Sequence, residues 1–129
     1  MVLDASAAVE LLLNSARGRR LNARLAADAE TLHAPHLADL EITQVLRRYV
    51  LHGRLDEPHA RLALARWRSL DVERYAHEPL LGRVWGLRDN LSAYDAVYVA
   101  LAEALGEVLV TGDRRLAAAP GLNLHVELA

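Results

Sequence analysis

Two acidic residues follow short apolar runs, as residues at the ends of buried strands do. Asp4 comes directly after Val2-Leu3, and Asp113 follows Val108-Leu109-Val110-Thr111-Gly112. Ligands of open parallel α/β sheets bind at the carboxyl ends of the strands. We therefore expect both carboxylates at one functional edge of a sheet.

Two further acids interrupt helical patterns that are otherwise apolar. Glu41 and Asp95 each have apolar residues four positions before and four positions after them, so each lies on an apolar helix stripe. A carboxylate buried alone tends to take up a proton, and the usual compensations are an ion pair or a metal ion. Four acids converging in one small domain favour a metal site.

Each of these acids also has a purely structural interpretation. Asp4 could cap the helix that follows it, and Ser92-Ala93-Tyr94-Asp95 fits a capping box. Asp113 could be an ordinary turn residue, and Glu41 could pair with Arg48 or reach water. Taken singly, the structural interpretations are the commoner ones. The joint arrangement is what favours a shared site.

Strand and helix patterns alternate along the chain, which is the organisation that would bring these acids together. Strands are expected at residues 1–4, 31–34, 72–75, 107–111 and 122–127, the last as an alternating edge strand. Helices are expected near 6–13 and 17–28 with Gly18 loosening their link, from Pro35 to His52, after an Asp56 cap to Ser69, and at 79–88, 92–105 and 113–118. The helix at 92–105 should be the most buried. These elements predict one α/β domain over residues 1–129, with a mainly parallel central sheet in a three-layer α/β/α arrangement.

Length and composition agree with a small independent domain. The chain has 129 residues, of which 53% are hydrophobic, enough for a core of its own. It has no cysteine, which excludes disulfides, thiolate metal sites and cysteine nucleophiles. The sequence opens directly on the first strand and has no apolar run of membrane-spanning length, so we expect a cytoplasmic protein without a membrane partner.

All 15 basic residues are arginine, although the formal net charge is −2. If a metal neutralised the four acids, the remaining surface would be positive, and the guanidinium fork suits phosphate. A lysine-free composition could equally reflect GC-rich coding. Arg114 and Arg115 follow Asp113 and are the better candidates for phosphate contact, whereas the cluster of Arg17, Arg19, Arg20 and Arg24 could be a solvated helix face.

Histidines and aromatic residues carry weaker signals. The six histidines show no ligand-like paired spacing, which favours structural or surface positions. Trp67 and Trp85 lie in helical patterns, where core or interface positions are commoner than base stacking. Tyr49, Tyr94 and Tyr98 could line a dimer surface, a point that the sequence leaves open.

Four segments of the chain, in order, resemble the signature blocks of a known family. They are Val-Leu-Asp-Ala-Ser-Ala (2–7), Leu-Ala-Asp-Leu-Glu-Ile-Thr-Gln-Val-Leu (37–46), Asn-Leu-Ser-Ala-Tyr-Asp-Ala-Val-Tyr-Val-Ala-Leu-Ala (90–102) and Leu-Val-Thr-Gly-Asp-Arg-Arg-Leu (109–116). The sequence is similar to PIN-domain ribonucleases, and within them to the VapC toxins of bacterial toxin–antitoxin systems. The resemblance extends from residue 2 to about the last strand.

This resemblance assigns roles to individual residues. It places the acidic quartet of the family on Asp4, Glu41, Asp95 and Asp113, with Ser6 and Thr111 as supporting polar positions. It also implies single-stranded RNA as the substrate, endonucleolytic cleavage, a homodimer and a cognate antitoxin that blocks the site.

A site made of carboxylates implies metal-dependent hydrolysis. Carboxylate oxygens bind Mg²⁺ or Mn²⁺, and one or two such ions can support in-line attack on a phosphodiester. We assign Asp4 and Asp95 as the main metal ligands. Asp113 and Glu41 are assigned as second-site or water-mediated ligands, with Ser6 and Thr111 in support.

Alternatives from other classes make different predictions. A phosphoacceptor receiver domain also has an acidic pocket, but it needs a lysine, and this chain has none. A degenerate binding module, with the acids as structural caps, would bind no divalent ion. A non-toxin RNA-processing nuclease of the same family would lack a neighbouring antitoxin gene.

Overall fold

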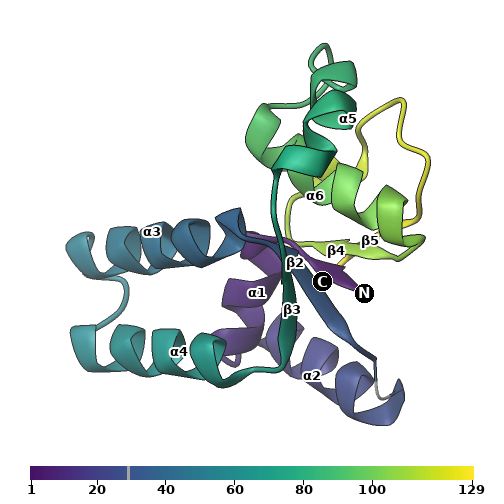
Figure 1. Cartoon of the computed structure of the whole chain (residues 1–129). Coiled ribbons are helices and arrows are strands. Elements are labelled where there is room, and N and C mark those ends of the chain that lie inside the picture. Colours follow the sequence, from purple (N-terminus) through teal and green to yellow (C-terminus); the bar gives the residue numbers. More distant parts are fainter. Residues whose placement is uncertain (29) are drawn as a thin grey trace.

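The computed structural model describes residues 1–28 and 30–129 and is built around a five-stranded sheet (Figure 1). The strand order is β3-β2-β1-β4-β5, and each neighbouring pair is parallel. The strands are β1 (Val2–Leu3), β2 (Leu32–Pro35), β3 (Val72–Tyr75), β4 (Leu109–Thr111) and β5 (Val126–Leu128). The predicted α/β class with a mainly parallel sheet is confirmed.

Helices cover both faces of this sheet and give the predicted three layers (Figure 1). One side carries α1 (Ala5–Leu12), α2 (Ala16–Asp28), α3 (Leu37–Leu51) and α4 (Glu57–Ser69). The other side carries the 3₁₀ turn Glu78–Leu80, α5 (Leu81–Gly86) and α6 (Ala93–Leu105), while the short α7 (Arg114–Ala117) follows β4. No helix in the described part of the chain is long and apolar enough to cross a membrane.

The core lies where β1 and β4 pack between α1 and α6. Every residue from Ala96 to Ala102 is buried, so α6 is apolar on all sides because protein surrounds it, as predicted. Its ends carry the expected signals: Ser92 Oγ accepts a hydrogen bond from the Asp95 backbone N–H (3.2 Å), and Gly106 closes the helix in the left-handed conformation at φ 67°.

Other predicted features hold at the start and the packing of α4. Asp56 caps the helix by accepting a hydrogen bond from the His59 backbone N–H (2.9 Å). Trp67 is buried and donates its indole N–H to Asp39 of α3 (2.7 Å), which ties the two helices together. Trp85, by contrast, is 69% exposed on α5.

Three local predictions are wrong. Pro35 does not open a helix but ends β2, a strand terminus that tolerates its missing N–H. Gly18 does not loosen the link between α1 and α2. It lies inside α2, where an added Cβ would stand 1.9 Å from the carbonyl oxygen of Glu10, so its small size permits close helix contact. The alternating stretch 122–127 forms a strand only from Val126, although β5 is an edge strand as expected.

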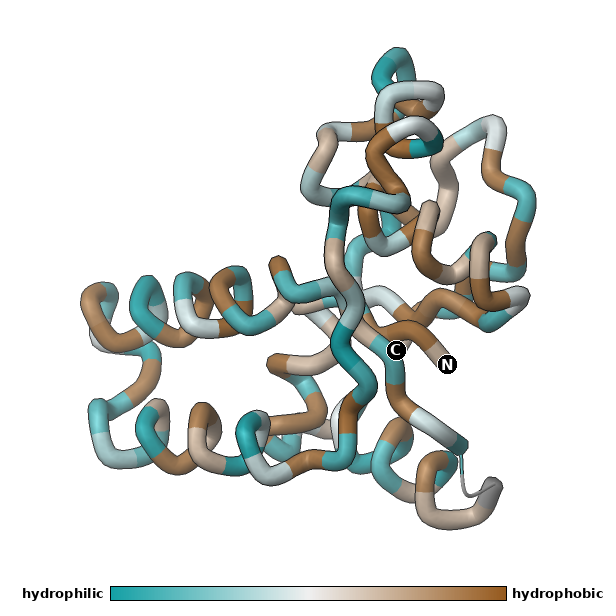
Figure 2. Tube along the Cα trace, in the orientation of Figure 1, coloured by the Kyte–Doolittle hydropathy of each residue, from teal (hydrophilic) through white to brown (hydrophobic). Residues whose placement is uncertain are grey.

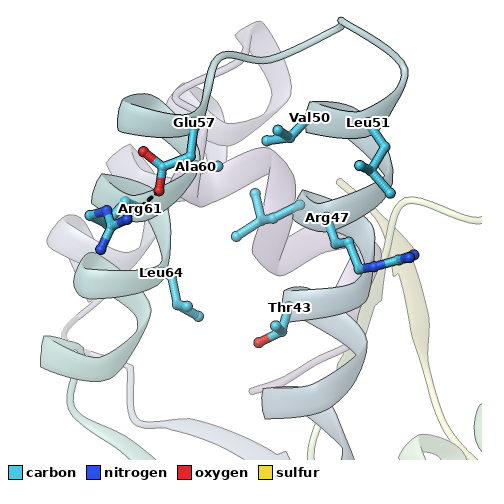
Figure 3. A pocket seen from close by; sticks show the side chains of 9 residues that line it. Thr43, Arg47, Val50, Leu51, Glu57, Ala60, Arg61 and Leu64 are labelled. Carbon is cyan, nitrogen blue, oxygen red and sulfur yellow. Dashed lines mark hydrogen bonds and ion pairs between the residues drawn. The ribbon is translucent and has the colours of Figure 1, made fainter.

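Helices α3 and α4 form an antiparallel pair that extends away from the sheet (Figure 1). Hydrophobic and hydrophilic positions alternate along both of them (Figure 2). A largely apolar cavity of about 390 Å³ lies between the two helices, with Val50 and Leu51 on one wall and Leu64 on the other (Figure 3). Its lining contains none of the four acids predicted to share a site.

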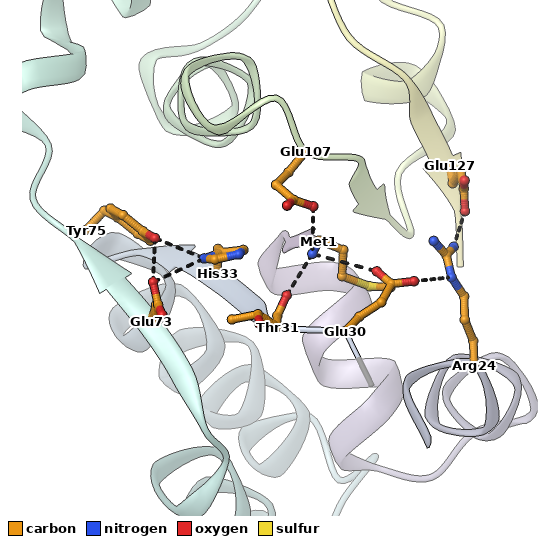
Figure 4. A network of polar contacts seen from close by, with 9 residues as sticks. All are labelled: Met1, Arg24, Glu30, Thr31, His33, Glu73, Tyr75, Glu107 and Glu127. Carbon is orange, nitrogen blue, oxygen red and sulfur yellow. Dashed lines mark hydrogen bonds and ion pairs between the residues drawn. The ribbon is translucent and has the colours of Figure 1, made fainter. Parts of the chain in front are cut away.

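Polar side chains join α2 and the edge strands to the rest of the sheet (Figure 4). Arg24 of α2 pairs with Glu30 (3.1 Å) and with Glu127 of β5. His33 of β2 hydrogen-bonds the hydroxyl of Tyr75 on β3 (3.0 Å). Arg24, one member of the predicted basic cluster, is therefore engaged in holding α2 against β5.

Candidate active site

Asp4 is held rigidly at the carboxyl end of β1. Its Oδ1 accepts hydrogen bonds from the Ala7 backbone N–H (2.8 Å) and the Ser6 hydroxyl (2.7 Å), and its Oδ2 accepts one from the Thr111 hydroxyl. The residue is only 6% exposed. Burial raises the pKa of the Asp4 carboxyl above its ordinary value, the three donors lower it in part, and the charge of Asp95 raises it further.

Ser6 and Thr111 connect this carboxylate to the loop after β4. The Ser6 hydroxyl accepts a hydrogen bond from the Gly112 backbone N–H (2.7 Å), and the Thr111 hydroxyl accepts one from the Asp113 N–H (2.9 Å). Because β1 and β4 pair side by side, Ser6 lies next to Gly112 and Asp4 lies next to Thr111, although more than 100 residues of sequence separate the members of each pair. The two residues predicted as polar support therefore lie beside Asp4 and fix the loop that carries Asp113.

Glu41 reaches the same region from the first turns of α3. Its Oε1 accepts a hydrogen bond from the hydroxyl of Tyr98 on α6 (2.7 Å). Partial burial raises the pKa of Glu41, the Tyr98 hydrogen bond lowers it in part, and the charges of Asp95 and Asp4 raise it further. The ion pair with Arg48 that the sequence left open is absent from the described residues.

Asp95 is the third residue of α6, and its backbone N–H donates a hydrogen bond to the Ser92 hydroxyl that caps the helix. Ser92 therefore caps α6 as predicted, but among the described residues the Asp95 carboxylate accepts no backbone hydrogen bond, so only half of the predicted capping box is present. The Asp95 carboxylate is near enough to raise the pKa of both Asp4 and Glu41 by electrostatic repulsion. Three acids from β1, α3 and α6 thus share one electrostatic environment.

Asp113 differs from the other three. It caps α7 by accepting a hydrogen bond from the Arg115 backbone N–H (2.8 Å), and the Arg115 guanidinium lies 3.5 Å from its other oxygen. The backbone hydrogen bond lowers the pKa of Asp113, desolvation raises it in part, and the hydrogen bond and charge of the Arg115 guanidinium lower it further. Its side chain is 34% exposed, so it lies at the rim and stays charged without help from a metal.

All four predicted acids line one cavity of about 350 Å³ at the carboxyl edge of the sheet. The polar part of its wall consists of Asp4, Ser6, Glu10, Glu41, Arg48, Tyr49, Asp95, Tyr98 and Asp113. This cavity differs from the one between α3 and α4, which is nearly all apolar and has no convergent acids. Because chemistry requires convergent polar groups, the acidic cavity is the candidate site.

The acids fit a divalent metal by their chemistry, although they do not form a finished coordination shell. Within residues 1–28 and 30–129, no three acidic or histidine side chains are close enough to hold one ion as they stand. Asp4, Glu41 and Asp95 nevertheless offer hard oxygen ligands and repel one another, and a cation between them would relieve that repulsion.

The family model of the PIN domain matches residues 1–122. The chain belongs to the PIN-domain family. It is 53% identical over 116 residues to ribonuclease VapC9 of Mycobacterium tuberculosis, which covers 90% of this chain and 87% of that protein. Among solved structures, the fold is similar to PAE2754 from Pyrobaculum aerophilum, with a TM-score of 0.71 and 28% identity over 97% of this chain and 81% of that one. It is also similar to VapC20 of Mycobacterium tuberculosis, a sarcin-ricin loop cleaving toxin, with a TM-score of 0.67 and 20% identity over 96% and 98% of the two chains.

Sequence reasoning missed two residues of this PIN-domain cavity, Tyr98 and Glu10, and it misplaced the role of Tyr98. Tyr98 is 2% exposed, so it cannot line a dimer surface, and its hydroxyl instead reaches Glu41. The signal was its position three residues after Asp95, which puts both side chains on one helix face. Glu10, four residues after Ser6 on α1, carries the same kind of signal.

The predicted phosphate-binding arginines lie beside the cavity and not in its wall. Arg114 and Arg115 are exposed at the start of α7, and Arg115 contacts Asp113. In the other basic cluster, Arg24 is paired with two glutamates and Arg19 donates to the Asn14 carbonyl oxygen (2.8 Å). Arg19 is exposed, as a solvated helix face requires, whereas Arg24 is partly buried in its ion pairs and does not fit that interpretation.

Proposed function

We propose that this PIN domain is a metal-dependent endoribonuclease that cleaves single-stranded RNA as the toxin of a VapBC-type pair. The observation that carries the proposal is the convergence of Asp4, Glu41, Asp95 and Asp113 on one cavity at the carboxyl edge of the sheet. The cavity wall contains no histidine or lysine that could replace a metal ion as the activator of water. The VapC ribonuclease at 53% identity supports the same reaction class.

We propose Mg²⁺ as the ion, with Mn²⁺ as a substitute, because nucleases of this family generally depend on a divalent metal. Asp4 and Asp95 would hold it, and Glu41 and Asp113 would act at a second position or through water. The bound ion would supply a Lewis acid and an activated water for in-line attack on phosphorus.

The side chains of the chain itself would perform the remaining tasks. Ser6 and Thr111 keep Asp4 in one orientation through their hydroxyl groups. Glu41, which lines the cavity, would orient the attacking water. Arg114 and Arg115, which are exposed beside Asp113, would contact the phosphates of a strand that enters the cavity.

Cleavage of a labelled single-stranded RNA with and without metal tests this proposal. We expect cleavage with Mg²⁺ or Mn²⁺ and only the background rate in excess EDTA. The Asp4→Asn and Asp95→Asn variants should also show only the background rate, once circular dichroism has shown that they are folded. Because no other residues in the cavity could perform the hydrolysis, full activity in excess EDTA would refute the metal-dependent mechanism.

We further propose a cognate antitoxin, a homodimer, a single domain over residues 1–129 and a location in the cytoplasm. A basic group from the antitoxin, such as an arginine, would match the charge of the acidic cavity. Co-expression with the product of the neighbouring gene should yield a stable, inactive complex. A free and active protein would instead indicate a non-toxin RNA-processing nuclease, and a protein without metal response or cleavage would indicate a binding module. Sedimentation analysis tests the dimer.

A further inference from the structure

Glu41 is held differently from the two aspartates that begin helices α1 and α7. Asp4 and Asp113 both accept hydrogen bonds from backbone N–H groups, which fix short side chains at helix starts. Glu41 has a longer side chain with more rotatable bonds, and it projects from within α3. Among the described residues, its carboxylate has one protein donor, the Tyr98 hydroxyl at 2.7 Å from Oε1.

Tyr98 is built to donate to that carboxylate. The residue is buried in the core and also forms part of the wall of the acidic cavity. The phenol carries an O–H group that can donate one hydrogen bond, and that bond goes to Oε1 of Glu41. The residue lies one turn after Asp95 on α6, so this contact joins the helix carrying Asp95 to the helix carrying Glu41.

We propose that Tyr98 is a positioning residue, whose hydroxyl fixes Oε1 of Glu41 and leaves Oε2 as the oxygen available to the metal or its bound water. This inference rests on the proposed metal-dependent function and extends it to a residue outside the acidic quartet. Removal of such an outer hydrogen bond typically lowers metal affinity or activity by about 10- to 100-fold.

Tyr98→Phe isolates the hydroxyl because the ring that packs in the core is kept. We expect the Kd for Mn²⁺, measured by calorimetry, to rise by about 10-fold and kcat to fall, with little change in KM for RNA. Tyr94→Phe is the matched control, since it removes the same group from an exposed residue of the same helix, and it should match the wild type.

A double-mutant cycle shows whether Tyr98 acts through Glu41. In a Glu41→Gln background, Tyr98→Phe should cause no further loss of Mn²⁺ affinity or kcat. An equal loss in both backgrounds, or wild-type affinity in Tyr98→Phe, would overturn the proposal.

Crystal structures of metal-free wild type and Tyr98→Phe separate this inference from the function itself. We expect the Glu41 carboxylate to move or become disordered in the variant, while Asp4 and Asp95 stay in place. An unmoved Glu41 would overturn the positioning role. Absence of Mn²⁺ binding and cleavage in the wild type would instead refute the proposed function, and the two crystal structures would still decide the role of Tyr98.

Discussion

Asp4 and Asp113 each cap a helix start with a carboxylate of a residue that also lines the cavity, while Asp95 lines the cavity from the first turn of α6. Asp4 and Asp113 accept from backbone N–H groups of α1 and α7, and Asp95 donates its own N–H to the Ser92 cap. Capping and a shared site looked like competing interpretations in the sequence, but they are one arrangement. Helix starts hold acids in place because their free N–H groups and dipoles favour negative charge.

Asp95→Asn removes one charge from the shared environment while keeping the shape of the side chain. Because Asp95 repels Asp4 and Glu41, the metal-free variant should melt at the same temperature as the wild type or higher, and the stabilisation by Mg²⁺ should shrink. Thermal melting of both proteins, with and without Mg²⁺, measures this. If Asp95 served only the helix dipole, the change would cost about 0.3–1 kcal/mol and leave the Mg²⁺ response intact.

Wild type and Asp95→Asn should also differ in how their unfolding free energy depends on pH. The pKa values of Asp4 and Glu41 are raised above 3.8 and 4.5, so the stability they contribute in the metal-free fold is present at low pH and is lost as pH rises through the raised values. Asp95→Asn lowers both pKa values by removing a repelling charge. The unfolding free energy of Asp95→Asn should therefore exceed that of the wild type by a margin that grows as pH rises above about 4 toward neutrality. Urea unfolding at several pH values without metal measures the difference, and a constant offset would contradict the prediction.

At the scale of elements, regular patterns were predictable from sequence and tertiary contacts were not. Strand–helix alternation and the caps at Asp56 and Ser92 follow from local chemistry, and the structure shows both. The stretch 122–127 alternates, but only its end pairs with β4, because pairing depends on where the neighbouring strand ends. The position of Gly18 was misread because the helix that it touches is visible only in the fold.

Gly18→Ala should destabilise the protein although alanine favours helix formation. The new Cβ would stand 1.9 Å from the Glu10 carbonyl oxygen, which is backbone and cannot swing aside, so α1 and α2 must separate. We expect a loss of about 1–3 kcal/mol in unfolding free energy, measured with urea. Gly82→Ala in α5 is the control, since its Cβ meets nothing within 4 Å, and it should gain about 0.5–1 kcal/mol. A gain of similar size at both positions would show that the close contact is unimportant.

At the scale of the molecule, the strand order gathers residues that are far apart in sequence. Placing β1 beside β4 brings Asp4 to Thr111, while α3 after β2 and α6 before β4 deliver Glu41 and Asp95 to the same edge. The sequence could predict this gathering because the acids follow strands or interrupt apolar helix faces. It could not predict the link from Tyr98 to Glu41, since that contact depends on how α6 lies against α3.

RNA binding by a molecule with a net charge of −2 must depend on local contacts. If Arg114 contacts a phosphate, Arg114→Ala should raise KM for single-stranded RNA. It should also reduce the slope of log(kcat/KM) against log salt concentration by about 0.7–1. Arg115→Ala should do the same and also remove the guanidinium's share of the lowered pKa of Asp113, while the backbone hydrogen bond stays, so its loss should be slightly larger at acidic pH. Arg68→Ala, which removes an equal charge from an exposed site on α4, is the control. A salt slope reduced as much by Arg68→Ala as by Arg114→Ala would mean that only overall charge matters, and it would remove Arg114 from the proposed path of the RNA.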